Sequence, residues 1–263
     1  MYQLNQIPSE TQIKKFIRRI VFGKNVYCPG CKSRKVIKYQ SRYHCLKCQK
    51  RFSLISDTFL KNMKINYQEF WLMLWCWVTQ VPVLQSMALS NFSEKAVRHW
   101  FDLFRKNLPA DQVVLTNLVQ LDEAFFKNNG LMLGKQIGTR KLAYEILGTT
   151  NVQRHHATNF LEHHITPKAQ LNTDGAKIYR NIDQWWPVIH HFDIHQKWEF
   201  SQTSEIEGMF GCFRTFVRRM YHHVTSDKLP SLVGEFCFRF SSPKIFNNPQ
   251  SYLEKTLRLM TTG

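Results

Sequence analysis

Two Cys-x-x-Cys pairs constrain the fold of this chain more tightly than any other local feature. The four cysteines are Cys28, Cys31, Cys45 and Cys48, and thirteen residues separate the two pairs. Each turn directs two thiolates to one point, and residues 36–39 and 42–44 can form short strands that bring the pairs together. The spacing predicts a zinc ribbon holding one structural Zn²⁺. Disulfides or free thiols are the alternative, which a reducing compartment disfavours.

Positive charge is concentrated in the same part of the chain. Residues 1–65 carry 15 Lys and Arg against two Asp and Glu, whereas residues 111–207 carry nine against eleven. Contacts to phosphates release counterions, so nucleic acid is the first candidate partner for such a basic segment. A basic segment that only adds solubility is the alternative. The cations that we expect to contact DNA around the ribbon are Lys35, Lys38, Arg42, Lys47, Lys50 and Arg51.

The composition indicates a globular chain with enough apolar residues for one large or two small domains. Hydrophobic residues make up 43% of the 263 residues. Seven cysteines are too few and too clustered for a secreted disulfide scaffold, and no apolar signal-peptide core is visible, so we expect a cytoplasmic protein. Residues 70–89 contain no charged residue, but polar residues interrupt them, which favours a buried helix over a membrane span.

Helical periodicity dominates the first hundred residues. Residues 9–22 predict a basic amphipathic helix with Ser9 as its N-cap. Three more helices are predicted at about 67–79, 83–89 and 94–107, and the short turn between the last two suggests a helix-turn-helix. Lys95 and Arg98 would then face DNA, with Arg105 and Lys106 on the same helix. An ordinary helical bundle is the alternative. Residues 108–111 are predicted to be a linker.

A strand with an acidic centre begins the next region. Val119, Leu121 and Phe125 alternate, so Asp122 lies on the face opposite Leu121, whereas Glu123 lies on the face of Leu121. Asp122 is therefore the better candidate for a metal ligand. Residues 128–130 predict a turn and residues 141–148 a second strand. The roughly 25 residues that follow must supply a third strand, a crossover helix or a shortened form of both.

Two further acids complete a candidate metal site. Asp174 ends an apolar run and precedes a glycine, which is typical of a strand followed by a turn; a plain turn-starting aspartate is the alternative. Glu207 stands near the start of a helix, where a capping box with Ser204 is the alternative role. Two aspartates and a glutamate can hold two divalent cations for phosphoryl transfer.

Helical geometry distinguishes Glu207 from the nearby Glu205. The two residues point about 200° apart on one helix, so only one can face the metals. We predict a buried stripe of Ile206, Met209, Phe210, Phe213, Val217 and Met220. Glu207 shares its side with Arg214 and Arg218, which are suited to holding phosphates, whereas Glu205 lies nearer Cys212 and Phe216, in less polar surroundings.

Histidines offer a rival site. His190, His191 and His195 lie close together with Asp193 and could bind a second metal, although phosphoryl-transfer sites prefer carboxylate oxygens. We interpret this run as the strand before the glutamate helix. His44, beside Cys45, is expected at the surface, and His222 and His223 are expected to face DNA or solvent.

Together these motifs resemble the DDE transposases of small bacterial insertion sequences, in the group with an amino-terminal zinc ribbon. The pieces that carry the resemblance are the two cysteine pairs and residues 121–123, 172–175, 206–208, 224–229 and 234–239. The family commonly has asparagine three residues before the glutamate and lysine seven after it. Here Ser204 and Arg214 stand at those positions, and Arg214 keeps the positive charge.

The resemblance implies an α/β fold with three parts. Residues 1–60 would form a basic helix plus the zinc ribbon, residues 61–110 a helical DNA-binding segment, and residues 111–263 an RNase H-like catalytic domain. Asp122, Asp174 and Glu207 would hold two Mg²⁺ or Mn²⁺ ions. The zinc would be structural.

The same resemblance implies a transposase that binds the terminal inverted repeats of its element, cuts the element ends and joins them to target DNA. Its partners would be double-stranded DNA and further copies of the chain, as a homodimer or larger assembly on DNA, with no membrane and no small-molecule substrate. A location at the bacterial nucleoid follows. A decayed or repurposed DNA-binding protein and a nuclease without strand transfer are the alternatives.

Overall fold

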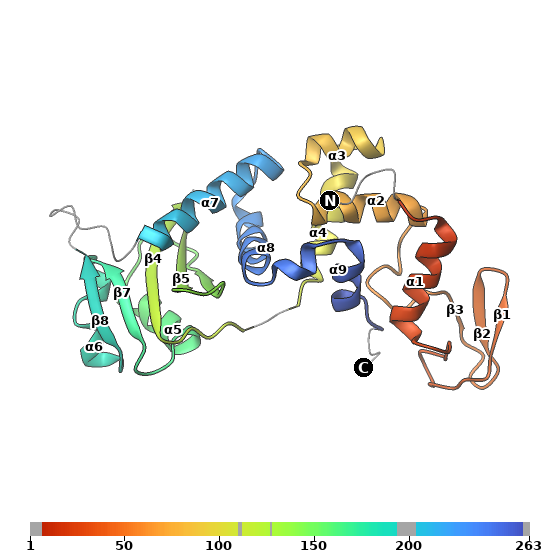
Figure 1. Cartoon of the computed structure of the whole chain (residues 1–263), viewed down its shortest axis with the longest axis horizontal. Coiled ribbons are helices and arrows are strands. Elements are labelled where there is room, and N and C mark those ends of the chain that lie inside the picture. Colours follow the sequence, from red (N-terminus) through yellow and green to blue (C-terminus); the bar gives the residue numbers. More distant parts are fainter. Residues whose placement is uncertain (1–6, 110–111, 127, 194–203, 260–263) are drawn as a thin grey trace. The chain divides into compact units, whose positions relative to one another are not determined.

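The computed structural model describes residues 7–109, 112–126, 128–193 and 204–259 (Figure 1). The chain divides into two compact units, residues 1–109 with 244–263, and residues 110–243. This division follows packing alone, so the three functional domains remain a prediction. The predicted linker at 108–111 falls at the boundary of the units, and its last two residues lie outside the described residues.

The first unit begins with helix α1 (Glu10–Phe22) and a three-stranded antiparallel sheet. Ser9 accepts a hydrogen bond from the backbone of Gln12 and closes a capping box, as expected of the N-cap. The sheet has the order β1 (Val36–Tyr39), β2 (Arg42–Cys45), β3 (Arg51–Phe52). Phe22 and Tyr43 both contact the buried ring of Phe52, so aromatic packing links the helix to the ribbon.

Three helices close to the predicted bounds follow in this unit. They are α2 (Tyr67–Val78), α3 (Val83–Ser90) and α4 (Glu94–Lys106). Asn66 and Ser93 cap α2 and α4 with their side chains, and Asn91 ends α3 in the left-handed conformation. The apolar run after residue 70 is the buried face of α2. In the part of the chain that the structure describes, no helix is long and apolar enough to cross a membrane.

The C-terminal helix packs in the first unit, a contact that local patterns did not predict. After η5 (Pro243–Phe246), helix α9 (Pro249–Thr256) places the buried Tyr252 against the rings of Trp77 and Phe104. The Tyr252 hydroxyl donates to the Phe104 carbonyl at 2.8 Å. Residues more than a hundred positions apart therefore share one aromatic core.

The second unit is a five-stranded mixed sheet with helices on both faces. Its strands have the order β6-β5-β4-β7-β8. The bounds are β4 (Leu118–Phe126), β5 (Asn129–Gln136), β6 (Leu142–Ile146), β7 (Gln170–Asp174) and β8 (Ile189–Asp193). β4, β5 and β6 form an antiparallel meander, and β7 and β8 run parallel to β4. Three antiparallel strands followed by two parallel ones fit an RNase H-like core.

The strand β5 was missed in the sequence because its apolar and polar residues do not alternate. Its residues Gly130–Gln136 are all buried. The segment before Asp174 supplies one crossover helix, α5 (Arg154–His164), and no additional strand. Gly134 explains how closely α5 packs, because a Cβ there would approach atoms of Leu115 and Phe160 to 2.9 Å.

The two faces of this sheet have different roles. Val119, Leu121 and Leu171 point to the face covered by α5 and form its apolar core with Phe160. The alternate residues point to the other face, which carries α7 (Ser204–Tyr221). Figure 1 shows α7 crossing β4 and β5. The remaining short elements are η2 (Lys177–Tyr179), α6 (Ile182–Trp185) and η4 (Ser226–Lys228).

A buried polar network joins α7 to α8 (Leu229–Ser241). The Tyr221 hydroxyl donates to Glu235 at 2.9 Å, and Arg239 pairs with the same carboxylate at 2.8 Å. Glu235 is fully buried, so losing either partner would leave a buried charge poorly compensated. Gly234 allows α8 to approach β6, because a Cβ there would lie 2.8 Å from the Tyr144 hydroxyl.

Candidate functional site

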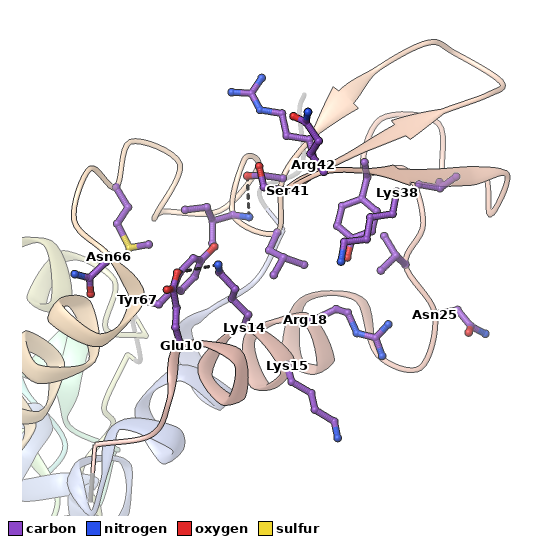
Figure 2. Close-up of a pocket in the computed structure, with 18 of the residues that line it drawn as sticks. Glu10, Lys14, Lys15, Arg18, Asn25, Lys38, Ser41, Arg42, Asn66 and Tyr67 are labelled. Atoms are coloured by element: carbon purple, nitrogen blue, oxygen red, sulfur yellow. Dashed lines mark hydrogen bonds and ion pairs between the residues drawn. The ribbon is translucent and has the colours of Figure 1, made fainter. Parts of the chain in front are cut away.

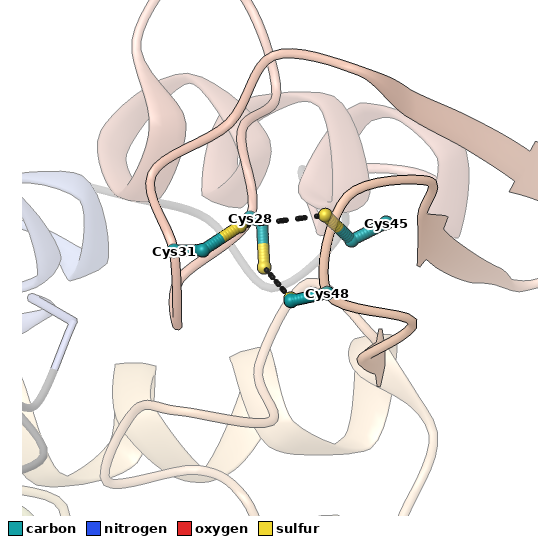
Figure 3. Close-up of side chains that lie close together, drawn as sticks. All are labelled: Cys28, Cys31, Cys45 and Cys48. Atoms are coloured by element: carbon teal, nitrogen blue, oxygen red, sulfur yellow. Dashed lines mark hydrogen bonds between the residues drawn. The ribbon is translucent and has the colours of Figure 1, made fainter.

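The four predicted cysteines converge on one point (Figure 3). Their sulfurs all lie within 4.8 Å of one another. The Cys28 and Cys48 sulfurs are 3.5 Å apart, as are those of Cys31 and Cys45. A disulfide would need about 2.05 Å, whereas sulfurs at the corners of a tetrahedral zinc site are about 3.8 Å apart. The donor set and its spacing therefore fit a structural Zn²⁺.

Both cysteine turns have the same backbone conformation. The carbonyl of Cys28 accepts the backbone N–H of Lys32 at 2.9 Å, and that of Cys45 accepts Gln49 at 2.9 Å. Lys32 and Gln49 both have positive φ, 59° and 61°. Backbone N–H groups, first that of Cys48, lower the pKa of the Cys45 thiol to about 6. At Cys45 the turn thus favours the thiolate that a metal requires, whereas at Cys48 the backbone N–H of Lys50 is outweighed by contacts with the sulfurs of Cys31 and Cys28, which raise the pKa of that thiol to about 12.

Three carboxylates converge in the second unit. Oxygens of Asp122, Glu123 and Asp174 lie within 4.8 Å of one another. Asp122 belongs to β4 and Asp174 ends β7, and these strands pair in parallel at Gln120 and Asn172, two residues earlier in each. Because side chains two residues apart on a strand project from the same face, Asp122 and Asp174 lie side by side on the face that carries α7. Parallel pairing of two strands therefore assembles this site.

Burial and repulsion from neighbouring carboxylates disfavour the charged forms of Asp122 and Glu123. Burial raises the pKa of Asp122 to about 7, and Glu123, Asp174 and Glu207 add repulsion. Burial also raises the pKa of Glu123, although the hydrogen bond from Tyr179 opposes this. A bound cation would relieve the same repulsion, so the donor set fits hard divalent ions.

Glu123 is the acid that strand periodicity ranked below Asp122 as a metal ligand. Its backbone position is on the α5 face, as predicted, and its carboxylate accepts the hydroxyl of the buried Tyr179 at 2.5 Å. The carboxylate nonetheless lies beside Asp122 and Asp174 near the end of the strand. Two adjacent acids in an otherwise apolar strand were the only sequence signal for it.

Two side chains of the sheet hold the start of α7. Gln120 accepts the backbone N–H of Ile206 at 2.9 Å, and Lys135 forms an ion pair with Glu205. Gln120 and Lys135 are direct partners in the β4–β5 register, so they project from the same face. The less polar surroundings expected for Glu205 are therefore wrong, because a buried cation lies against it.

Glu207 is exposed on the first turns of α7, and its charge acts on Asp122. The three acids within 4.8 Å of one another do not include it. The predicted stripe is buried except at Val217, which is partly exposed; Phe216 is buried instead, because its ring packs on Phe236 of α8. Residue 203 lies outside the described residues, and the capping role of Ser204 stays a prediction.

Most of the predicted DNA contacts are exposed cations. Exposed among them are Lys35, Lys38, Arg42, Lys47, Arg51, Lys95, Arg214 and Arg218. Lys50 pairs with Asp57 at 3.0 Å, and Arg98 pairs with Glu94 at 2.7 Å. The Arg214 guanidinium lies over the ring of Phe126 at 5.2 Å. Arg105, which we placed on the helix facing DNA, is buried and paired with Asp102.

The histidines do not gather into a site in the described part of the chain, where the two candidate metal groups are the four cysteines and the three acids. His190 contacts the Thr173 hydroxyl at 2.9 Å, and His44 contacts Gln49 at 2.8 Å. His195 lies outside the described residues. His222 and His223 are exposed.

Known families and proteins match this arrangement. Residues 114–241 match the ISXO2-like transposase domain, and residues 8–51 match the transposase zinc-ribbon domain. An uncharacterized protein in the transposable element ISH50 of Halobacterium salinarum is 25% identical over 133 residues, which are 48% of this chain and 45% of that protein. The match thus spans about half the length of that relative.

A solved structure, the simian T-cell lymphotropic virus intasome in complex with PP2A regulatory subunit B56 gamma, matches with 12% identity and a TM-score of 0.37. It covers 64% of this chain and 67% of that one, and a score this low carries no argument.

The mixed sheet with its acidic cluster and the four-cysteine ribbon define a DDE-type transposase domain preceded by a transposase zinc ribbon. The two matched models together cover well over half of the residues, and the relative is also an insertion-element protein. The chain is therefore a DDE-type transposase of an insertion sequence, in the group with an amino-terminal zinc ribbon.

Proposed function

We propose that the chain binds the terminal inverted repeats of its insertion sequence and catalyses metal-dependent cleavage and strand transfer of DNA. Asp122, Asp174 and Glu207 would hold two Mg²⁺ or Mn²⁺ ions, and the four cysteines one Zn²⁺. The observation that carries this proposal is the meeting of Asp122 and Asp174 on neighbouring parallel strands, on the face that carries α7.

The chain's own residues would position the reacting groups. Asp122 accepts the backbone N–H of Glu123 at 2.8 Å, and Asp174 accepts that of Ala176 at 3.0 Å, so one oxygen of each is fixed. Gln120 and Lys135 hold the start of α7, which supports Glu207 near the pair. Paired divalent ions in such a site supply charge stabilisation and activation of a water or a 3′-hydroxyl.

Glu123 supports this site and is a further candidate ligand. Tyr179 is buried and donates to one oxygen of Glu123, and an oxygen of Glu123 lies within 4.8 Å of the aspartate oxygens. Because Glu123 projects from the other face of β4, this hydrogen bond would help to hold its carboxylate beside the aspartates. Tyr179→Phe should therefore weaken cleavage less than loss of either aspartate.

DNA would be held mainly by the basic first unit, where the exposed cations of the ribbon and of α4 lie. Arg214 and Arg218 on α7 would hold the phosphates of a strand lying over the acids. Copies of the chain would assemble on DNA as a homodimer or a larger complex.

The test is a strand-cleavage and strand-transfer assay on duplexes that carry the two ends of the element encoding the chain. Wild-type protein should cut and join in Mg²⁺ and do neither in EDTA. Cutting without joining would favour a nuclease of the same fold. Binding with no cutting under any divalent cation would favour a repurposed DNA-binding protein and refute the enzymatic proposal.

A further inference from the structure

A wide groove lies in the first unit between α1 and the ribbon hairpin (Figure 2). Its volume is about 1330 Å³. Lys14, Lys15 and Arg18 of α1 line one side, and Arg34, Lys38 and Arg42 of the hairpin region line the other. We refer to it as the ribbon groove. Four of these cations, Lys14, Lys15, Arg18 and Arg34, were not among the ribbon residues that the sequence singled out for DNA contact.

The charges in this groove are largely uncompensated. Among the described residues that line it, Glu10 is the one acid, and it pairs with Lys14 at 2.8 Å. Lys14 also lies over the ring of Tyr67 at 5.2 Å, so its charge is already partnered. Arg18, Lys38 and Arg42 are exposed and form no ion pair within the described part of the chain. Their charges are available to a ligand.

Buried side chains anchor both walls of the groove to the rest of the first unit. Ile13 and Ile17 are fully buried beneath α1, which fixes the side of the helix that carries Lys14 and Arg18. Lys38 and Tyr43 are register partners on one face of the hairpin, and Tyr43 stacks on Phe52 at 5.5 Å. Cations on the two walls of the groove can contact one extended anion at several points.

We propose that the ribbon groove binds the sugar–phosphate backbone of duplex DNA and is the main phosphate-binding surface of the first unit. This proposal rests on the proposed function and specifies which face contacts the element ends. Ser41, Asn25 and Asn66 add neutral donors along the same lining, and such groups accompany Lys and Arg in contacts to phosphates. Each phosphate neutralised releases condensed counterions, which an acidic protein segment would not do to the same extent.

The experiment compares two triple variants of the full, zinc-loaded chain. The groove variant is Arg18→Ala, Lys38→Ala, Arg42→Ala. The control variant is Arg19→Ala, Lys24→Ala, Lys61→Ala, which removes the same charge at exposed positions of the same unit outside the groove. Zinc content and circular dichroism establish that both variants are folded.

Binding to a labelled 30-base-pair duplex of arbitrary sequence is measured as a function of salt, because phosphate contacts are independent of sequence. Each lost phosphate contact lowers the slope of log affinity against log salt by about 0.9. For the groove variant, we expect the slope of log affinity against log salt to fall in magnitude by roughly two to three, and the affinity at low salt to fall at least about tenfold. For the control variant, we expect the slope to fall by less than about one.

Equal losses in the two variants, or no loss in the groove variant, would overturn the proposal, because binding would then depend on diffuse charge or on another face. Polyglutamate of matched charge serves as the second probe. If the wild-type chain binds it as tightly as the duplex, and the groove variant loses both equally, the groove takes acidic protein segments instead.

Failure of the proposed function would have a different signature, namely a wild-type chain that binds the duplex but does not cleave element ends in Mg²⁺. If the triple variant loses its zinc, the single variant Arg18→Ala is measured in its place. Loss of one phosphate contact should then lower the slope of log affinity against log salt by about one.

Discussion

The two units of this chain place their functional residues by different means. In the first unit, all four metal ligands lie within 21 consecutive residues, Cys28 to Cys48, and two identical backbone turns aim them. In the second unit, Asp122 and Asp174 are 52 positions apart and meet only because β4 pairs with β7. The ribbon site is therefore local, and the acidic site depends on the whole sheet.

This difference has an energetic consequence. A ribbon of short strands has little apolar core of its own, so we expect its stability to depend on the metal. The sheet buries Val119, Leu121, Leu171 and Phe160, so we expect it to fold without ions. Loss of zinc and loss of the divalent cations should thus have different effects. Loss of zinc should disturb the ribbon and weaken DNA binding, whereas loss of the divalent cations should stop DNA cleavage and leave the fold intact.

The largest expected effect is on chemistry in the second unit. Asp174→Asn, or Asp122→Asn, keeps the size of the side chain but removes a charged cation ligand. Cleavage of element ends should fall by at least about a thousandfold, since both reacting oxygens depend on the ions. Duplex binding should stay within a factor of about two. Cleavage in Mg²⁺ above a tenth of the wild-type rate would contradict the assignment.

Glu207→Gln should have an effect of the same order on cleavage. The removal of this charge also removes one of the repulsions acting on Asp122. Binding of the duplex serves as the control measurement, because Glu207 contributes no positive charge. If this variant cleaves at near the wild-type rate, Glu207 is not the third carboxylate ligand of the ions, and Glu123 becomes the candidate.

Removal of zinc should act on the first unit alone. Cys45→Ser, or extraction with a strong chelator, should unfold the ribbon and weaken duplex binding at least tenfold. The thermal transition of the second unit should not move by more than about 2 °C, because no cysteine of the site belongs to its core. A common loss of both transitions in calorimetry would show that the units do not fold independently.

The sequence predicted the local features of both units well. Cysteine spacing located the four cysteines that cluster, and apolar periodicity, with Ser9 as the expected N-cap of the first helix, located the helices within a few residues. The position of Asp122 on the face of its strand opposite Leu121 followed from the alternation of apolar residues along that strand. These features depend on neighbours within about one turn or one strand.

Features that depend on distant partners were not predictable in the same way. The burial of β5 has no period, the carboxylate of Glu123 lies in the acidic cluster and accepts the hydroxyl of Tyr179, which is 56 positions away, and the partner of Glu205 is a lysine 70 positions away. Tyr252 joins α9 to the first unit through rings that no local pattern connects. Long-range packing decided each of these cases.

A smaller effect should come from overpacking the core of the second unit. Gly134→Ala would place a Cβ 2.9 Å from Leu115 and Phe160, so α5 must shift or a ring must leave its position. The free energy of unfolding should fall by about 1–3 kcal/mol. Gly211→Ala, where an added Cβ meets no atom within 4 Å, is the matched control and should be neutral or slightly stabilising. Equal effects in urea melts would contradict this packing.

The smallest effect on catalysis is expected at Glu205. Glu205→Gln removes the ion pair with Lys135, whose side chain is 7% exposed, and leaves a nearly buried cation without its carboxylate. Stability should therefore fall by roughly 1–2 kcal/mol, while cleavage stays within about tenfold of wild type, since Gln120 still holds the start of α7.

The double variant Lys135→Met, Glu205→Gln separates the contribution of this ion pair to stability from its contribution to cleavage. The double variant removes the unpaired charge, so most of the lost stability should return, and the cleavage rate should stay near that of Glu205→Gln. If Glu205→Gln abolishes cleavage while Glu207→Gln keeps it, the orientation of α7 relative to Asp122 and Asp174 is wrong, and Glu205 is the third acid of the site.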